Sequence, residues 1–276
     1  YRLGYRSWAI DLVKQIPDDS PFAQSAELKL AQWLGHTRQK DDLQKAVDIL
    51  KPAVEPILEA TAPIPLSPPT VSRMFDYIEL CLRGFKPGSA LSAIRYIESA
   101  SSEFAQPLPP QQIDRLRFAR GQCLAELSSL DPALEVLSEI THEPYTSQGA
   151  ILQAKIQIAQ QQTEDAKLAL REVIENTTHW RYANDALTLL NAMEPLVGES
   201  QELFCTSMLY RLQGRFSDAI PLLRQIAVEN YEQDVEEWAR YTIGILEESR
   251  GDVQEAREEW NRLALDADHP VIHGLT

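Results

Sequence analysis

Two histidines near the end of the chain have a spacing that could bind a metal ion. His269 and His273 are four residues apart, and Asp266 and Asp268 precede them. Histidines at positions i and i+4 share one face of a helix and can ligate zinc there. Pro270, however, disfavours a regular helix across this segment. We therefore expect solvated loop histidines here and no metal site.

No other set of residues has the spacing of a catalytic centre or a cofactor site. The 11 glycines form neither of the common phosphate-binding motifs, and the nucleophile elbow Gly-x-Ser-x-Gly does not occur. Adjacent acids, such as Glu236/Glu237 and Glu258/Glu259, point about 100° apart on a helix and do not converge, so we expect them on a solvated face. We expect no catalytic residues and no cofactor.

The three cysteines are too few and too far apart for a disulfide framework or a zinc knuckle. Cys81, Cys123 and Cys205 each lie in an apolar stretch with helical periodicity. We therefore expect each of them to be a small buried hydrophobe.

The acidic charge of the chain argues against nucleic acids and anionic membrane surfaces as partners. The 276 residues carry 26 basic and 41 acidic side chains, a formal net charge of -15, and the whole excess falls in residues 101–276. Nucleic-acid backbones require clustered Lys and Arg, and anionic membrane surfaces require a basic patch. No apolar run approaches the roughly 18 residues of a membrane-spanning helix. The acids are densest after Glu229, where they either solubilise the surface or steer a basic partner.

Helical periodicity is nearly continuous along the chain, and strand patterns are absent. The clearest unit covers residues 238–263. In it, the small residues Gly244 and Ala256 let two antiparallel helices approach closely, Gly251 turns the chain between them, and Trp260 fills the space beside the contact. We expect an all-α chain built of such pairs.

The same scheme recurs upstream. Gly121 and Ala133, and Ala154 and Ala166, have the same spacing as Gly244 and Ala256. Gly214 and Ala219 have the spacing of the turn glycine Gly251 and Ala256, and two looser copies contain Ala46 and Ala93. In these residues the sequence resembles the tetratricopeptide repeat family, whose 34-residue unit is a pair of antiparallel helices. The interval from Ala133 to Ala166 is 33 residues, whereas the other intervals are longer. The resemblance implies a right-handed α-solenoid of antiparallel helix pairs.

We expect a single elongated helical-repeat domain over residues 1–276. Its parts are an N-terminal end helix (1–21), divergent helix pairs (22–106) with a Pro-rich insertion (61–69), clearer repeat-like pairs (110–178), an extra helix without an obvious partner (179–195), the best repeat-like pairs (200–266) and a tail (267–276). Because the chain starts at Tyr1 inside a helical pattern, we expect that its true N-terminus is missing.

In this family, ligands usually lie along a concave groove formed by the first helix of each pair. The residues of this chain at the matching positions are Arg115, Phe118, Gln122, Gln148, Ile151, Lys155, Phe204, Met208, Arg211, Trp238 and Tyr241. Aromatic side chains with isolated cations are typical of interface hot spots. The alternative is that many of these residues, notably Phe204, Trp238 and Tyr241, belong to the core between adjacent pairs.

The resemblance implies a non-catalytic scaffold or adaptor that binds a peptide or a helical segment of another protein. Family members that clamp the C-terminal carboxylate of chaperones have Lys and Asn at the groove positions of adjacent repeats. The set Phe118, Gln122, Ile151 and Lys155 does not match that pattern, so we do not expect a chaperone-tail adaptor. One alternative is a self-associating array, a homo-oligomer. The other is a sensing or recruiting part of a larger enzyme or regulator. Both the cytoplasm and the bacterial periplasm stay open.

Overall fold

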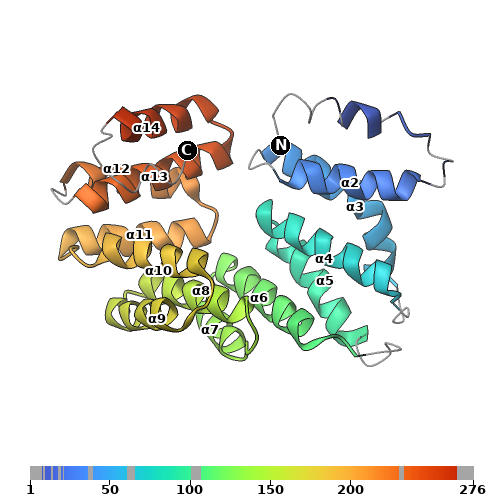
Figure 1. Ribbon diagram of the computed structural model, residues 1–276, viewed down its shortest axis with the longest axis horizontal. Helices are drawn as coiled ribbons and strands as arrows, with labels where there is room; N and C mark the ends of the chain where they lie inside the picture. Colours follow the sequence, from blue (N-terminus) through green and yellow to red (C-terminus); the bar gives the residue numbers. More distant parts are fainter. Residues whose placement is uncertain are drawn as a thin grey trace. The chain divides into compact units, whose positions relative to one another are not determined.

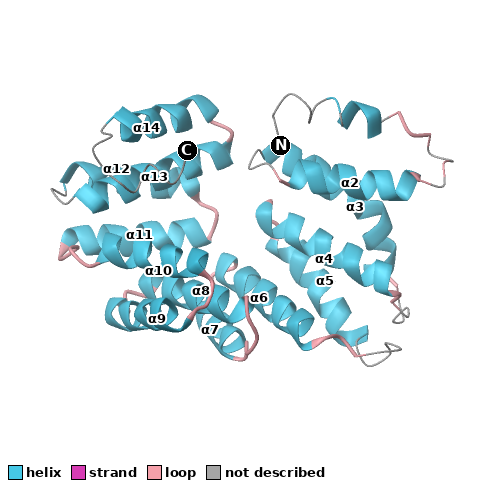
Figure 2. Cartoon of the chain, viewed as in Figure 1, coloured by secondary structure: helices cyan, strands magenta, loops and turns pink. Residues whose placement is uncertain are grey.

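The computed structural model describes residues 22–36, 40–60, 66–100, 107–229 and 233–265, with positions 8, 10–13, 15–17 and 20. All regular elements in these residues are helices, and most consecutive helices pack against each other (Figures 1 and 2). The predicted all-α class is confirmed. The expected end helix at 1–21 and the insertion at 61–69 lie largely outside the described residues, and the tail with His269 and His273 lies wholly outside them.

The chain divides into two compact units, and the first is Tyr1–Leu108. Its described helices pack in chain order: α2 (Ala23–Gly35), α3 (Lys40–Leu58), α4 (Pro68–Arg83) and α5 (Pro87–Ala100). Helix α4 begins where the side chain of Ser67 accepts a hydrogen bond from the backbone N–H of Thr70. At its other end, the Arg83 guanidinium donates a 2.7 Å hydrogen bond to the carbonyl of Gly35. This bond fixes the end of α4 to the end of α2.

The second unit is Pro109–Thr276. Its helices are α6 (Pro110–Glu126), α7 (Leu130–Ser138), α8 (Tyr145–Ala159), α9 (Thr163–Asn176), α10 (Trp180–Met193), α11 (Glu199–Leu212), α12 (Phe216–Glu229), α13 (Gln233–Arg250) and α14 (Val253–Leu265). Four tight pairs form in chain order: α6 with α7, α8 with α9, α11 with α12, and α13 with α14. These pairs correspond to the repeat units that the sequence predicts.

Small residues hold the paired helices close together, as the sequence predicts. A Cβ atom added at Gly244 would overlap the indole ring of Trp260, and one added at Gly121 would overlap the side chain of Leu137. Ala133, Ala166, Ala219 and Ala256 are fully buried at the corresponding contacts. Gly251 turns the chain between α13 and α14 with a φ of +98°, a conformation that favours glycine.

Helix α10 is the extra helix expected at 179–195. It packs on α9 and also contacts α8 and α13, while α11 packs on α12 and on α8. Gln201 near the start of α11 bonds Thr163 at the start of α9, and Gln213 just after α11 bonds Ser128 after α6. Helix α11 therefore runs from the α8–α9 turn to the α6–α7 turn. Helix α8 thus contacts α10 and α11 in addition to α6, α7 and its pair partner α9.

Two acids of the last helices contradict the expected solvated face. The side chains of Glu247 and Glu259 are 4% and 7% exposed. Each one pairs with two arginines. Glu247 binds Arg224 at 3.0 Å and Arg250 at 2.9 Å, and Glu259 binds Arg240 at 3.4 Å and Arg262 at 3.2 Å. Local sequence patterns do not indicate this burial, because one of the two arginines that bind each Glu comes from a neighbouring helix.

Replacing Gly244 by alanine is expected to lower the free energy of unfolding by about 1–3 kcal/mol, because the added methyl group would overlap Trp260. Chemical denaturation of the whole chain measures this loss. In the matched control Gly88→Ala, the added atom meets nothing within 4 Å, and the exchange of Gly for Ala in α5 should raise stability by up to about 1 kcal/mol. Equal effects of the two substitutions would contradict the close packing of α13 on α14.

Candidate binding surface on α6, α8 and α11

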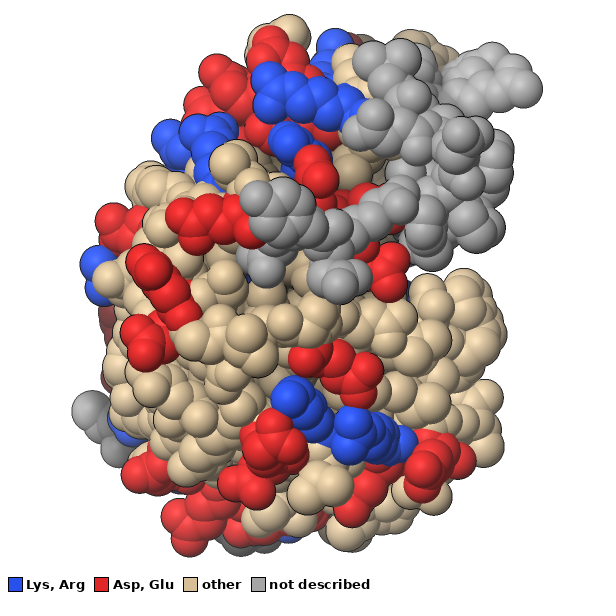
Figure 3. Space-filling view, turned by 90° about the vertical axis from the view of Figure 1, so that its left-hand side faces the viewer, with Lys and Arg blue, Asp and Glu red and all other residues tan. Residues whose placement is uncertain are grey.

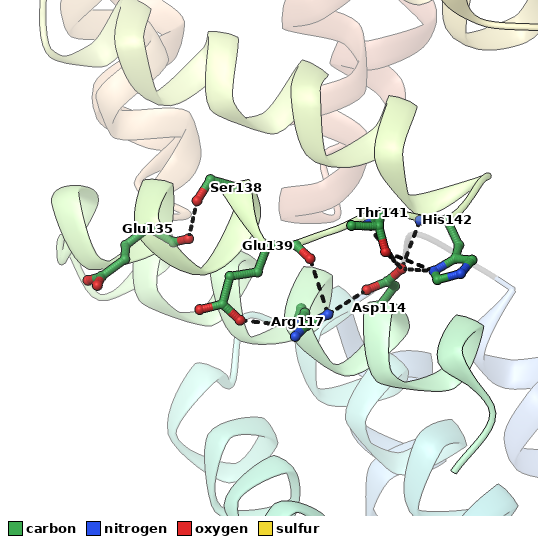
Figure 4. Close-up of polar contacts among 7 residues, drawn as sticks. All are labelled: Asp114, Arg117, Glu135, Ser138, Glu139, Thr141 and His142. Atoms are coloured by element: carbon green, nitrogen blue, oxygen red, sulfur yellow. Dashed lines mark hydrogen bonds and ion pairs between the residues drawn. The ribbon is translucent and has the colours of Figure 1, made fainter.

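A buried carboxylate near the start of α6 organises a cluster of polar contacts (Figure 4). Asp114 accepts hydrogen bonds from the backbone N–H groups of Thr141 and His142 at 3.1 and 2.8 Å, and its Oδ2 atom lies 2.8 Å from Nδ1 of His142. Its other oxygen accepts from Arg117 at 3.0 Å, and Arg117 also donates to the backbone carbonyl of Glu139. Together these contacts fasten the α7–α8 connection to α6.

The pKa of Asp114 follows from these contacts. Burial raises the pKa, but the hydrogen bonds from His142, Arg117 and the two backbone N–H groups outweigh burial, so the pKa lies below its usual value. An Asp–His pair also occurs in hydrolases, where the second ring nitrogen faces a nucleophile. Here the Thr141 hydroxyl lies 3.0 Å from Nδ1, the nitrogen that already faces Asp114. The geometry of this cluster therefore fits a structural clasp.

Helix α10 contacts the face of α8 where the resemblance expects a ligand. Gln148 donates a hydrogen bond to the hydroxyl of Tyr182 on α10. Ile151 belongs to the same hydrophobic cluster as the buried residues of α10. One turn further along α8, the charge of Asp185 on α10 acts on Lys155. Helix α10 therefore already interacts with the three predicted positions on α8.

Arg211, near the end of α11, is held against an aromatic ring. Its guanidinium carbon lies 5.3 Å from the ring centroid of Trp238 on α13, a cation–π contact. Trp238 packs in turn on Phe204, with ring centroids 4.8 Å apart. The Nη1 atom of Arg211 is buried and has no hydrogen-bond partner. The aromatic ring therefore fixes the guanidinium, while its Nη1 atom donates no hydrogen bond to a described residue.

Lys155 and Arg211 lie close enough for their charges to interact. Burial lowers the pKa of Lys155 to about 8, and repulsion by Arg211 adds to this effect while Asp185 opposes it. Burial lowers the pKa of Arg211 to about 10. Within the described part of the chain, neither cation forms an ion pair. Two positive charges therefore sit at the junction of α8, α11 and α13 in a strongly acidic chain.

A third half-buried ionisable group lies on α6. The Oε2 atom of Glu126 is buried without a hydrogen-bond partner, and its Oε1 atom accepts from Gln122 at 3.3 Å. Burial raises the pKa of Glu126 to about 8, although the bond from Gln122 opposes the shift. The Oε1 atoms of Gln157 on α8 and of Gln160 just after it are also buried without partners. Helices α6, α8 and α11 thus each carry polar atoms that no contact within the described residues satisfies.

The structure distributes the predicted partner-binding residues over three environments. Phe204, Met208 and Ile151 are buried in the core, and Trp238 is nearly so at 8% exposed. Arg115, Phe118, Gln122, Gln148, Lys155 and Arg211 are half-buried on α6, α8 and α11, whereas Tyr241 is exposed. Of these, Lys155, Arg211, Trp238 and Phe204 come together at one junction. Phe118 packs with Leu212 of α11 on the hydrophobic cluster of α6–α8.

Three residues around this surface, Glu126, Asp185 and Tyr182, are not among those predicted from the sequence. Glu126 lies one turn after Gln122 on the same helix, so the repeat positions could have indicated it. Asp185 and Tyr182 belong to α10, which has no counterpart in a regular repeat unit. No spacing rule could therefore have placed them beside α8.

The expectation for the cysteines is confirmed, because Cys81, Cys123 and Cys205 are free and buried. Within the described residues, no group of three or more His, Cys, Asp or Glu side chains could hold a metal ion. No described helix is both long enough and apolar enough to cross a bilayer. On the face drawn in Figure 3, basic side chains lie beside acidic ones and form no separate patch.

Comparison of the chain with protein-family models, with curated proteins and with solved structures gives no match. The resemblance to the tetratricopeptide repeat family therefore rests on the small and aromatic residues of the helix pairs.

Replacing Asp114 by asparagine is expected to destabilise the second unit by about 2–3 kcal/mol at neutral pH, because several donors lose a charged acceptor. In the unsubstituted chain, the contribution of Asp114 is fully present above its unfolded pKa of about 3.9 and is lost as the pH falls through its lower folded pKa. Denaturation curves between pH 7 and pH 3 test this sign. A loss of stability that is independent of pH would contradict it.

Replacing Glu126 by glutamine is expected to raise stability at alkaline pH. The folded pKa of about 8 exceeds the unfolded value, so ionisation of this buried group costs stability as the pH rises from about 4.3 to 8. The glutamine variant should gain on the order of 1–2 kcal/mol at pH 9, after allowance for partial exposure. Thermal unfolding from pH 5 to pH 9 measures the gain, and the exposed Glu135→Gln on α7 serves as control. Parallel pH curves for the two variants would contradict this account.

Proposed function

We propose that the chain is a non-catalytic protein–protein interaction scaffold that binds a peptide or a helical segment of another protein. In this proposal the helix pairs form a right-handed α-solenoid of the tetratricopeptide-like kind. The partner segment lies on the surface formed by α6, α8 and α11, with Tyr241 of α13 at its exposed edge. The observation that carries the proposal is the junction where Arg211 lies against Trp238 and interacts with the charge of Lys155, while neither cation forms an ion pair with a described residue.

Two properties of this surface support a partner-binding role. Interface hot spots combine aromatic rings with arginines in partly desolvated positions, and the junction has this composition. In addition, buried polar atoms cost free energy unless they are hydrogen-bonded, so the unsatisfied atoms of Glu126, Gln157 and Arg211 favour a state in which a partner supplies the missing bonds. Such polar contacts add specificity to binding that is driven by apolar burial.

A capture experiment tests the proposal. The wild-type chain and the double variant Arg211→Gln/Tyr241→Ala are immobilised, exposed to lysate of the source organism, and their retained proteins are quantified by mass spectrometry. We expect at least one protein whose recovery falls about tenfold or more in the variant, because two contact residues are lost. Arg95→Gln, on the exposed face of α5, is the matched control and should retain the same protein fully.

Two results would contradict the proposal. The first is equal recovery by the wild-type chain and the double variant, which would exclude this surface. The second is recovery of the chain alone, which would favour the self-associating array. Circular dichroism of each variant shows whether its helices are intact.

A further inference from the structure

The buried charges of the last helices are paired, whereas two cations on α8 and α11 are not. The last helices place two arginines on each buried glutamate: Arg224 and Arg250 on Glu247, and Arg240 and Arg262 on Glu259. Lys155 and Arg211, in contrast, have no acid within ion-pair distance among the described residues. The chain thus neutralises the buried glutamates of its last helices, but it leaves these two cations without an ion pair among the described residues.

The Arg211 side chain is prepared for a planar anion. The ring of Trp238 covers the guanidinium at 5.3 Å and restricts its orientation. Its Nη1 atom, which is buried and lacks an acceptor, can donate to an oxygen placed at the edge of the guanidinium plane. Carboxylates accept two parallel hydrogen bonds from such an edge. Since the guanidinium is desolvated by burial, a charge-assisted bond here is stronger than one in water.

We propose that Lys155 and Arg211 bind the carboxylate of an aspartate or glutamate side chain in a segment of the partner protein. This inference rests on the proposed scaffold function and adds the chemistry of the partner. Arg211 donates to the carboxylate through its guanidinium edge, and the Lys155 ammonium approaches one of the carboxylate oxygens from α8. The acidic residue of the partner thus supplies the counter-ion that the chain itself lacks.

The local charge favours a carboxylate over a phosphate. Lys155 and Arg211 carry two positive charges, and Asp185 on α10 contributes one negative charge that acts on Lys155. One carboxylate brings the sum of these charges to zero. A phosphorylated side chain carries about −1.5 to −2 at neutral pH and would leave a negative sum beside Asp185. The acidic surface of the chain as a whole adds to the repulsion of strongly charged anions.

Side-chain NMR of the whole chain, labelled in its lysines, tests the proposal directly. The probe is glutamate capped at both ends, N-acetylglutamate N-methylamide, added up to about 100 mM at constant ionic strength. We expect saturable shifts of the Lys155 signals and a rise in the pKa of Lys155 from about 8, because the bound carboxylate favours the charged ammonium. Capped glutamine has the same shape without the charge and should leave Lys155 unchanged.

Variants and a second anion locate the site. Arg211→Gln should weaken the binding of capped glutamate about tenfold or more, whereas Arg95→Gln should not change it. Lys155→Gln, followed through the labelled side chain of Arg211, gives a second test if the first variant folds poorly. Equal responses to capped glutamate and capped glutamine would overturn the proposal, as would the absence of any response. Tighter binding of capped phosphoserine would also overturn it and would indicate a phosphorylated partner.

The outcomes also separate this inference from the scaffold function. If capture of a partner depends on Arg211 and Tyr241 while capped glutamate does not bind, the scaffold function stands and the carboxylate site is wrong. If capped glutamate binds and capture fails, the site exists without the proposed partner surface.

Discussion

The close approach of paired helices is the constraint on which the rest of this structure depends. Each helix pair buries its apolar face only against its neighbours, so every pair needs one position where two backbones can nearly touch. Gly121 and Gly244 provide these positions, because a Cβ atom there would overlap Leu137 or Trp260. Fully buried alanines complete the contacts. With apolar burial satisfied inside the pairs, the outer positions of α6, α8 and α11 are left for polar side chains.

The extra helix α10 changes what these outer positions can do. Helix α8 contacts both α10 and α11 in addition to its partner α9, so its polar side chains become half-buried where a regular array would leave them open. Lys155 and Arg211 are desolvated in this way, and the ring of Trp238 holds Arg211 in place. Charges in such surroundings interact strongly with any anion that reaches them. The same helix that interrupts the repeat thus creates the chemistry of the proposed binding surface.

Most of the fold could be predicted from the sequence, because helical periodicity, small residues and turn glycines are local signals. Gly244, Gly251 and the extra helix around Trp180 are examples. The site was harder to predict, because positions that face a groove and positions that face the next pair recur at the same helical spacing. Phe204 and Met208 are buried for this reason. The course of α11 depends on bonds from Gln201 to Thr163 and from Gln213 to Ser128, which join residues 38 and 85 positions apart, and no local pattern records them.

The free energy of unfolding of Lys155→Met, measured against the wild-type chain without any partner, tests the central claim most directly. In the proposed binding role, Lys155 is a desolvated cation beside Arg211, without an ion pair among the described residues, and it costs stability. Replacing it by an apolar side chain of similar length should therefore raise the free energy of unfolding by about 1 kcal/mol or more at neutral pH. A decrease of similar size would contradict the account, because it would mean that Lys155 has a stabilising partner within the chain and serves the fold.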